Sequence, residues 1–422
     1  MTAAPISLTL DFHSPRMAQP STIGSFRLMR RIDQYLGPPL CMALALVPSL
    51  AARVSPPTPA AVRNLLVIKF WGMGSIVLAT PALRALKRAY PAARITFLTF
   101  EQNEPICRMI TAIDRVHPFR ASGPLVFAAS FVRLLRVLWR ERFDVVLDFE
   151  FFANFTAIIT ALSRARVRVG FHTPKWWRAR FYSIGVPFDR GHITENFLQA
   201  VEALGATADD GGLDELVVSD PTAATTLERV LAERDVRPDE PLICINVNAS
   251  ALDYKRRWPL PYYRGLIERL LAHGEHCRVV LTGAREDAPY VAALMAVLPA
   301  SPNVVNLCGV LNLAQLVRLL QRARLFIGND SGPLHLAAAA GVPTVSFFGP
   351  ESPAMYGPRG SAHTVLYRGI ACSPCLNVHN SKDNSACRNN VCLQSISVDD
   401  AWEAVRARLA EPRPWSAEGA AL

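Results

Sequence analysis

The sequence predicts an α/β protein built from two doubly wound, Rossmann-like domains. Three observations support this fold class. The chain has 422 residues, more than one ordinary hydrophobic core organises. Its composition, 50% hydrophobic and 19% charged, is that of a folded protein. Short apolar runs rich in β-branched residues alternate with helical periodicity, and this alternation begins at Leu65 and again at Leu242.

An N-terminal extension, residues 1–60, precedes the first domain. Its uncharged span from Gln34 to Ala52 has 19 residues, close to the ~20 that cross a bilayer as a helix. Prolines would break or kink such a helix, at Pro38, Pro39 and Pro48. Because arginines flank the span, at Arg27, Arg30, Arg31 and Arg53, we favour an interfacial membrane anchor. The alternative is a helical arm packed on the first domain. A stiff proline-rich linker, residues 55–60, follows.

The first domain, residues 61–215, opens with a strand, a glycine turn and a helix at Leu65–Phe70, Trp71–Ser75 and Thr80–Arg88. The pattern then predicts a strand at Arg94–Thr99, a short edge strand at Asp114–Pro118, a helix over 124–141 and a buried strand at Asp144–Phe149. Gly72 and Gly74 let a ligand approach the backbone closely. Ligands of doubly wound sheets lie beyond the carboxyl ends of the strands, where Ser75 and Glu150 stand.

The second domain, residues 216–395, repeats this pattern, and a C-terminal helix and tail, residues 396–422, follow it. The predicted strands are Leu242–Val247, Cys277–Thr282, Arg324–Gly328 and Pro343–Phe348. Helices are predicted at about 261–273 and 312–322, and a small-residue helix covers Leu336–Gly341. A basic segment, Lys255–Pro259, lies in the loop after the first of these strands.

The most informative local feature is the string Asn329–His335, which reads Asn-Asp-Ser-Gly-Pro-Leu-His and opens a helix. Backbone N–H groups at a helix start suit a pyrophosphate, and a carboxylate such as Asp330 suits sugar hydroxyls. Asp and Ser are also good helix caps, so simple capping is the alternative interpretation. Capping alone does not require the whole string, and we therefore favour ligand binding.

These motifs resemble glycosyltransferase family 9, the ADP-heptose:lipopolysaccharide heptosyltransferases. The matching segments are Leu66–Arg84, Arg256–Pro259, Gly328–Ala338 and Val342–Pro350, and the resemblance covers about residues 62–410. It implies the GT-B architecture of two Rossmann-like domains that face a shared cleft. It also implies an inverting transfer of heptose, or a related sugar, from a nucleotide diphosphate donor to a lipopolysaccharide or other cell-envelope glycan acceptor.

The resemblance also implies which residues bind the donor. Asp330 would hold sugar hydroxyls, Ser331 and Gly332 would offer N–H groups to the pyrophosphate, and His335 would lie close by, with Asn329 in the same string. The phosphate-binding lysine of the family is replaced by Arg256 here, with Lys255 beside it; either cation neutralises phosphate. Glu286, close to Gly283 in the sequence, is a candidate for the donor ribose. Gly72 and Gly74 would line the acceptor side.

The chain departs from the family at the catalytic carboxylate, which follows the glycine of the first turn. Ser75 occupies that position, and a hydroxyl is a poor general base. Glu150 ends the fourth strand, which neighbours the first strand across the switch point, so a carboxylate could remain in the same cleft. The alternative is that Glu150 is a solvated loop residue. Glu101 and Glu104, after the second strand, are next in line as the base.

No cofactor is expected to be required, because GT-B enzymes stabilise the leaving diphosphate with helix N-termini and cations, and we see no catalytic metal motif. The cysteines Cys372, Cys375, Cys387 and Cys392 have a spacing compatible with a structural zinc site. The family often carries a cysteine-bearing loop here without metal. Reduced thiols, disulfides and zinc all remain open.

A formal net charge of +10 favours anionic partners, among them phosphate-bearing donors and a membrane surface. The basic residues are scattered, which argues against nucleic acid. Without a visible secretory signal, the chain is predicted to be cytoplasmic and peripheral on the inner face of the inner membrane. Two other functions remain: a catalytically impaired nucleotide-sugar-binding homologue, suggested by Ser75, and a dinucleotide-dependent oxidoreductase. The second lacks a complete Gly-x-Gly-x-x-Gly turn, since Val77 stands at the third glycine.

Overall fold

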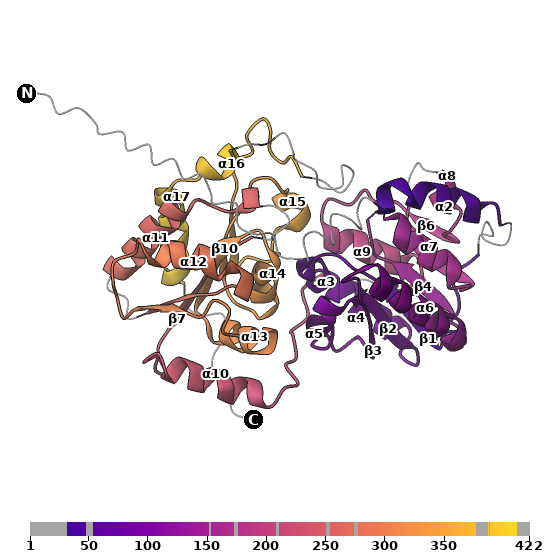
Figure 1. Ribbon diagram of the computed structural model, residues 1–422, viewed down its shortest axis with the longest axis horizontal. Coiled ribbons are helices and arrows are strands. Elements are labelled where there is room, and N and C mark those ends of the chain that lie inside the picture. The colour runs from indigo at the N-terminus through magenta and orange to yellow at the C-terminus, as the bar shows by residue number, and fades with distance from the viewer. Residues whose placement is uncertain are drawn as a thin grey trace, which may run out of the picture.

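The computed structural model consists of two α/β domains that lie side by side (Figure 1). It describes residues 32–47, 54–151, 153–172, 176–207, 211–249, 254–273, 277–376, 387 and 389–411. Each domain is built on a six-stranded parallel sheet, which confirms the predicted fold class.

The first sheet has the strand order β3-β2-β1-β4-β5-β6. Its strands are β1 (Asn64–Ile68), β2 (Arg94–Phe100), β3 (Arg115–Phe119), β4 (Val145–Asp148), β5 (Val167–Phe171) and β6 (Ile184–Val186). The chain moves outward in one direction from β1 to β3 and in the other from β4 to β6. The switch point therefore lies between β1 and β4, as predicted, and β3 is the predicted edge strand.

Helices cover both faces of this sheet, and the central strands β1, β4 and β5 are almost completely buried. The helices are α3 (Met73–Val77), α4 (Thr80–Ala89), α5 (Glu104–Cys107), α6 (Pro124–Glu141), α7 (Asn154–Leu162), α8 (Trp176–Ala179) and α9 (Ile193–Glu202). Leu66 and Ile68 of β1 face α6 and α7, whereas Leu65 and Val67 face α4 and α9. This two-sided burial explains the continuous apolar runs of the sequence.

The second sheet has the order β12-β11-β10-β7-β8-β9. Its strands are β7 (Leu242–Asn246), β8 (Arg278–Leu281), β9 (Val304–Asn306), β10 (Leu325–Asn329), β11 (Thr344–Phe347) and β12 (His363–Leu366). The helices are α10 (Thr222–Ala232), α11 (Leu260–Ala272), α12 (Ala288–Met295), α13 (Leu313–Arg322), α14 (Gly332–Ala339), α15 (Pro353–Tyr356), α16 (Val391–Gln394) and α17 (Val398–Ala410). The switch point lies between β7 and β10.

Part of the N-terminal extension forms an arm, residues 32–47, that includes helix α2 (Gly37–Ala45) and packs on α7 and α8. Pro38 and Pro39 lie where a helical segment at residues 32–35 ends and α2 begins, so the helical path is interrupted at these prolines, as expected from the sequence. They occupy the first turn of α2, where the backbone N–H groups have no intrahelical acceptor and proline is tolerated. Residues 1–31 and 48–53 lie outside the described residues. Within the described part of the chain, no helix is long and apolar enough to cross a membrane.

Candidate functional site

The predicted donor site lies at the switch point of the second sheet, where β10 leads into α14. Asn329, at the end of β10, is fully buried and holds the surrounding loops together. Its Nδ2 donates hydrogen bonds to the carbonyls of Val247 (3.1 Å) and Asn248 (3.0 Å), and its Oδ1 accepts one from the backbone N of Trp258 (2.8 Å). Asn329 therefore ties the end of β10 to both ends of the loop between β7 and α11, and its side chain is already engaged inside the protein.

Three buried polar atoms around this helix start have no hydrogen-bond partner among the described residues. They are Ser331 Oγ, His335 Nδ1 and Asn248 Oδ1. Ser331 is the N-cap residue of α14, but its side chain makes no capping hydrogen bond, which argues against the simple capping interpretation. Buried polar groups are nearly always paired, so a cluster of unpaired ones indicates a place where a polar ligand binds.

Arg256 and Asp330 form an ion pair beside this cluster. Arg256 ends a short 3-10 helix, Tyr254–Arg256, and its Nη2 lies 2.5 Å from Asp330 Oδ2 and 2.8 Å from the Asp330 carbonyl oxygen. Both side chains are largely buried. The structure thus brings together the predicted phosphate-binding cation and the predicted sugar-binding carboxylate. Lys255, the residue before Arg256, is half-buried.

The basic segment is held in place by Trp258, which is completely buried. Its ring stacks on Phe347 at 4.1 Å between centroids, and its Nε1 donates to the carbonyl of Ile396 (2.9 Å). Gly283 packs closely against Asn248, since a β-carbon at Gly283 would lie 2.6 Å from Asn248 Nδ2. Glu286, the ribose candidate, is exposed on a short 3-10 helix at the edge of this region.

The glycine turn of the first domain faces α14 directly. A β-carbon at Gly74 would lie only 2.4 Å from Cδ2 of His335, so any larger residue at Gly74 would collide with the imidazole. Gly72 has a φ of +81°, a conformation that favours glycine. Burial lowers the pKa of His335 to about 4, so the imidazole at this domain contact is neutral at pH 7.

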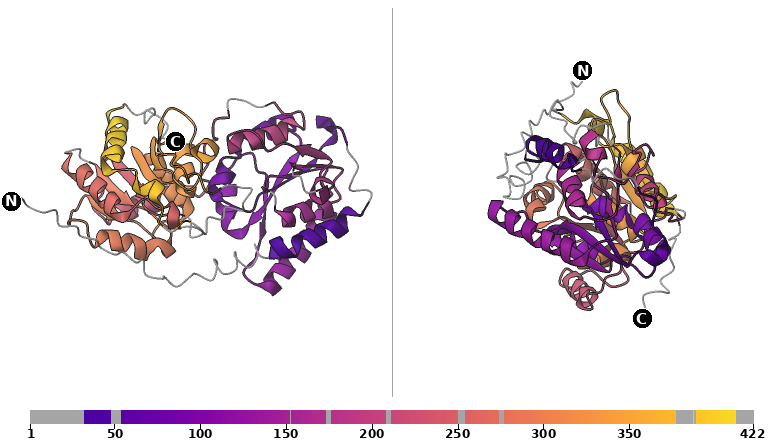
Figure 2. Two further views of the ribbon diagram at one scale, coloured as in Figure 1. Left: turned by 90° about the horizontal axis from the view of Figure 1, so that it is seen from above. Right: turned by 90° about the vertical axis from the view of Figure 1, so that its right-hand side faces the viewer.

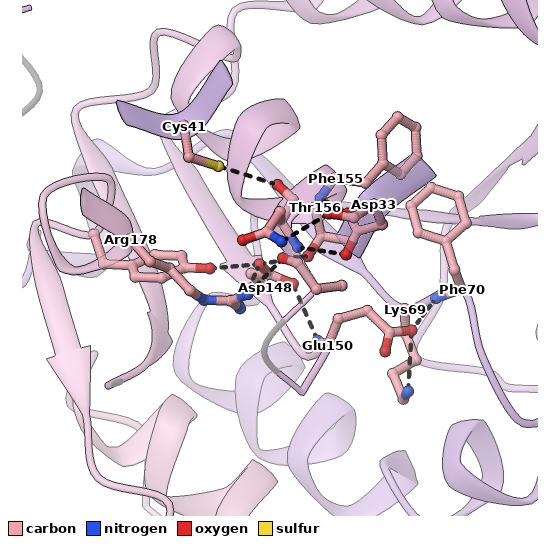
Figure 3. A network of polar contacts seen from close by, with 12 residues as sticks. Asp33, Cys41, Lys69, Phe70, Asp148, Glu150, Phe155, Thr156 and Arg178 are labelled. Carbon is pink, nitrogen blue, oxygen red and sulfur yellow. Dashed lines mark hydrogen bonds and ion pairs between the residues drawn. The ribbon is translucent and has the colours of Figure 1, made fainter. Parts of the chain in front are cut away.

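Glu150 lies where the sequence placed it, at the end of β4 beside β1, but it is not a solvated loop residue. It is 3% exposed. Its Oε1 accepts hydrogen bonds from the backbone N of Phe70 (2.6 Å), the backbone N of Trp71 (2.7 Å) and Lys69 Nζ (3.1 Å) (Figure 3). No described residue donates a hydrogen bond to Oε2. One carboxylate oxygen thus fixes the glycine turn, and the other is uncommitted within the described protein.

A second buried carboxylate, Asp148, lies next to Glu150 and supports it (Figure 3). Its Oδ1 accepts from the backbone N of Glu150 (3.0 Å), and its Oδ2 accepts from Thr156 Oγ1 (2.8 Å) and Tyr182 OH (2.6 Å). Arg178 Nη2 lies 3.6 Å from Oδ2. Burial raises the pKa of Asp148, while Arg178 and these hydrogen bonds oppose that rise.

Tyr356 of the second domain is buried and lies within electrostatic range of charged groups from both domains. Burial raises its pKa well above the ordinary range, Glu351, Asp330 and Glu150 raise it further, and Arg256 opposes the rise. Glu150 of the first domain and the Arg256–Asp330 pair of the second thus act on the same side chain. Ser75, on α3, is half-buried. The two reserve candidates pair instead with arginines: Glu101 Oε1 lies 2.7 Å from Arg120, and Glu104 pairs with Arg108.

No disulfide links the cysteines of the described residues. Burial, together with the neighbouring Cys375, Cys387 and Cys372, raises the pKa of Cys392 to about 11, so the four cysteines share one region. No three His, Cys, Asp or Glu side chains of the described residues are placed to hold a metal ion. Residues 377–386, between these cysteines, lie outside the described part, and the zinc hypothesis stays a prediction.

Four residues of this site were missed by the sequence analysis: Lys69, Asn248, Glu351 and Tyr356. Lys69 follows β1 directly, and Asn248 lies two residues after β7. Because ligands of doubly wound sheets bind beyond the carboxyl ends of such strands, these positions could have identified both residues as candidates. Glu351 and Tyr356 follow β11 and carry no comparable local pattern. Their place becomes evident only when the two domains face each other.

Comparison with known proteins places this geometry in context. The family model of glycosyltransferase family 9 (heptosyltransferase) matches residues 131–386. The chain is 28% identical over 287 residues to lipopolysaccharide heptosyltransferase 3 of Escherichia coli, covering 65% of this chain and 80% of that protein. It is 27% identical over 334 residues to lipopolysaccharide heptosyltransferase 1 of Pseudomonas aeruginosa, covering 74% and 86%.

Solved structures show the same fold. A family 9 glycosyltransferase from Veillonella parvula superposes with a TM-score of 0.69 at 20% identity, covering 83% of this chain and 98% of that one. ADP-heptose lipopolysaccharide heptosyltransferase II of E. coli gives 0.64 at 19% identity, covering 82% and 98%. The E. coli heptosyltransferase WaaC with ADP gives 0.62 at 20% identity, covering 82% and 99%.

Proposed function

The chain belongs to glycosyltransferase family 9, the heptosyltransferase family, and from this premise we propose that it transfers heptose from an ADP-heptose-like donor to a lipopolysaccharide core acceptor. The names of its curated relatives support the acceptor, and those of two similar solved structures support the adenine nucleotide. A lipid-linked acceptor places this reaction at the cytoplasmic face of the inner membrane, with the enzyme peripheral to it.

One observation carries the donor site: Ser331 Oγ and His335 Nδ1 of the α14 region and Asn248 Oδ1 of the loop bonded to Asn329 are buried and unpaired, and Arg256 bonds to the adjacent Asp330. A nucleotide diphosphate supplies what these groups lack. Its pyrophosphate oxygens accept hydrogen bonds from Ser331 Oγ and from the N–H groups at the helix start, where the helix dipole favours negative charge. The guanidinium of Arg256 adds a positive charge, held in a fixed position, beside the same pyrophosphate.

The transfer is a single displacement with inversion at the anomeric carbon. The acceptor hydroxyl oxygen forms a bond to that carbon while the bond from the carbon to the diphosphate oxygen breaks. The bonding pair leaves with the nucleoside diphosphate, whose growing charge is stabilised by Arg256 and the α14 helix start. The acceptor proton passes to a general base, and we assign this role to Glu150 Oε2. Ser75, at the family position, would contact the acceptor through its hydroxyl.

A second function, a nucleotide-sugar-binding protein without transfer activity, is suggested by one observation: Ser75 stands where the family has its catalytic carboxylate. Mass spectrometry of acceptor glycans after incubation with ADP-heptose separates the two. A product one heptose heavier than the acceptor supports the transferase. Tight ADP-heptose binding without any product supports the binding protein.

The donor site is tested by Ser331→Ala. Because Ser331 Oγ has no partner in the described protein, its removal should leave the melting temperature unchanged and weaken ADP binding about tenfold in calorimetry. The matched control is Asn329→Ala, which removes three internal hydrogen bonds and should lower the melting temperature. Unchanged ADP affinity in a folded Ser331→Ala variant would contradict this site.

A further inference from the structure

The N-terminal arm is held firmly on the first domain by its inner face. Gly37, Cys41 and Ala45, spaced four residues apart, are its buried residues, and the two larger ones pack against α7. Asp33 adds polar contacts to the first turn of α7, at residues 154 and 155. The arm is therefore a fixed surface feature of the domain.

The outer face of the arm is apolar. Its exposed large hydrophobic side chains are Ile32, Tyr35, Leu36, Leu40, Met42, Leu46 and Val47, and Leu46 is 75% exposed. Helix α6 exposes four more: Leu125, Val126, Val132 and Trp139. Together these are eleven of the fifteen exposed large hydrophobics of the described residues, so the apolar surface is concentrated on two helices. We call these eleven side chains, with the exposed arginines of α6, the docking face.

Both helices lie on the same side of the first domain (Figure 2). Helix α7 lies between them: Ala45 of the arm packs against it, and its Phe155 contacts Phe127 and Phe131 of α6, with ring centroids 5.4 and 6.2 Å apart. Farther along, Trp139 Nε1 of α6 donates to the carbonyl of Leu162 at the end of α7 (3.1 Å). The two apolar surfaces thus flank one central helix.

The exposed charged side chains of the arm and α6 are all arginines. Asp33 is the single charged side chain of residues 32–47, and its carboxylate is bonded to α7. Helix α6 exposes Arg133, Arg136 and Arg140, while its one acid, Glu141, pairs with Arg115. The sequence around the arm adds Arg27, Arg30, Arg31 and Arg53, which lie outside the described residues.

We infer that the docking face binds the surface of an anionic lipid bilayer. Apolar side chains on one side of a helix insert at the boundary between headgroups and acyl chains, and nearby arginines attract anionic headgroups. A second copy of the chain fits this face less well, because a self-complementary contact would bring arginines against arginines. The inference does not rest on the transfer reaction, since binding to lipid can be measured without donor or acceptor.

The test is cosedimentation of the full chain with vesicles of phosphatidylcholine alone or with phosphatidylglycerol added. The wild-type protein should bind the anionic vesicles, bind the neutral ones more weakly, and lose affinity as salt is raised. Leu36→Asp combined with Leu40→Asp should weaken binding at least tenfold. The control, Val297→Asp with Val310→Asp, places two acids at similarly exposed valines of the second domain and should bind like wild type.

Two further pairs keep the inference testable if the aspartates disturb folding. Leu36→Ala with Leu40→Ala suits a helix and should still weaken binding. Arg133→Ser with Arg136→Ser should lower affinity for anionic vesicles about fivefold or more, whereas Arg285→Ser with Arg406→Ser, which removes the same charge from the second domain, should lower it less. Absence of binding by wild type, or equal losses in the controls, overturns the inference. So does a dimer in analytical ultracentrifugation that the Leu36 and Leu40 variants dissociate.

Discussion

Glu150 has a structural role in the glycine turn, and we propose that the same side chain has a chemical one. Through Oε1 it holds the backbone of the glycine turn and neutralises buried Lys69, and through Oε2 it can accept a proton. The family position for the base carries Ser75, but the first and fourth strands are neighbours, so a carboxylate still reaches the same turn. We therefore propose that Glu150 supplies, at this turn, the carboxylate that the family has at the position of Ser75.

Glu150→Gln tests this role. The amide keeps the acceptor oxygen for Phe70 and Trp71 but cannot take a proton, so the turnover rate should fall about 10²–10⁴-fold while ADP binding persists. Adding Ser75→Asp should restore part of the rate, because it returns a carboxylate to the family position. Rates are measured by mass spectrometry of the product and ADP binding by calorimetry.

The control for the Glu150 prediction is Lys69→Met, which breaks the same buried pair yet keeps the carboxylate. Removing either partner of a buried pair destabilises the fold by about 3–5 kcal/mol, so both variants should melt earlier. The two should differ in chemistry, with the larger loss of turnover in Glu150→Gln and rescue by Ser75→Asp only there. Full activity of the Glu150→Gln variant would show that another residue is the general base.

Helix α7 depends on a cap from a distant part of the chain. Its N-cap residue, Ala153, offers no side-chain acceptor, and Asp33 supplies one instead: Oδ1 accepts from Phe155 N (2.6 Å) and Oδ2 from Asn154 N (3.1 Å). Asp33→Ala should lower the free energy of unfolding by about 1–2 kcal/mol and speed amide hydrogen exchange at residues 154 and 155. Gln34→Ala, at the adjacent exposed position, should do neither. Equal stability of the two variants would argue against the cap.

Elements with a strong local pattern were predictable, and elements that depend on remote contacts were not. The helix predicted over 124–141 is α6, since amphipathic periodicity persists along its whole length. Strand β12, four half-buried residues, has no comparable pattern. The Asp33 cap joins residues 121 positions apart, a contact that no local pattern indicates.

The same distinction applies to the candidate site. The sequence predicted that the string Asn329–His335 opens a helix and binds a ligand, and that β1 and β4 are neighbouring strands. Which side chains of the string face inward could not be predicted: Asn329 is used inside the protein, whereas Ser331 and His335 keep unpaired polar atoms. The partners of Glu150 also could not be predicted, because they depend on how the turn at Phe70 and Trp71 folds over β4.

The two domains meet closely at α3 and α14, and this contact depends on the absence of a side chain at Gly74. His335 lies against the glycine, and Met73 reaches Gly332 from the other side. Under the proposed function, a donor held on the second domain reacts only if the first domain brings the acceptor and Glu150 to it. We therefore expect the fit at Gly74 to govern whether the complete site assembles.

Gly74→Ala should keep the domains from closing. Its β-carbon would lie 2.4 Å from His335 Cδ2, so either the imidazole or the domain contact must shift. We expect turnover to fall at least tenfold and the radius of gyration from small-angle X-ray scattering to rise, while ADP binding on the second domain persists. Gly191→Ala is the matched control, because a β-carbon there meets no atom within 4 Å. If Gly74→Ala retains wild-type turnover and compactness, assembly of the site does not depend on this contact.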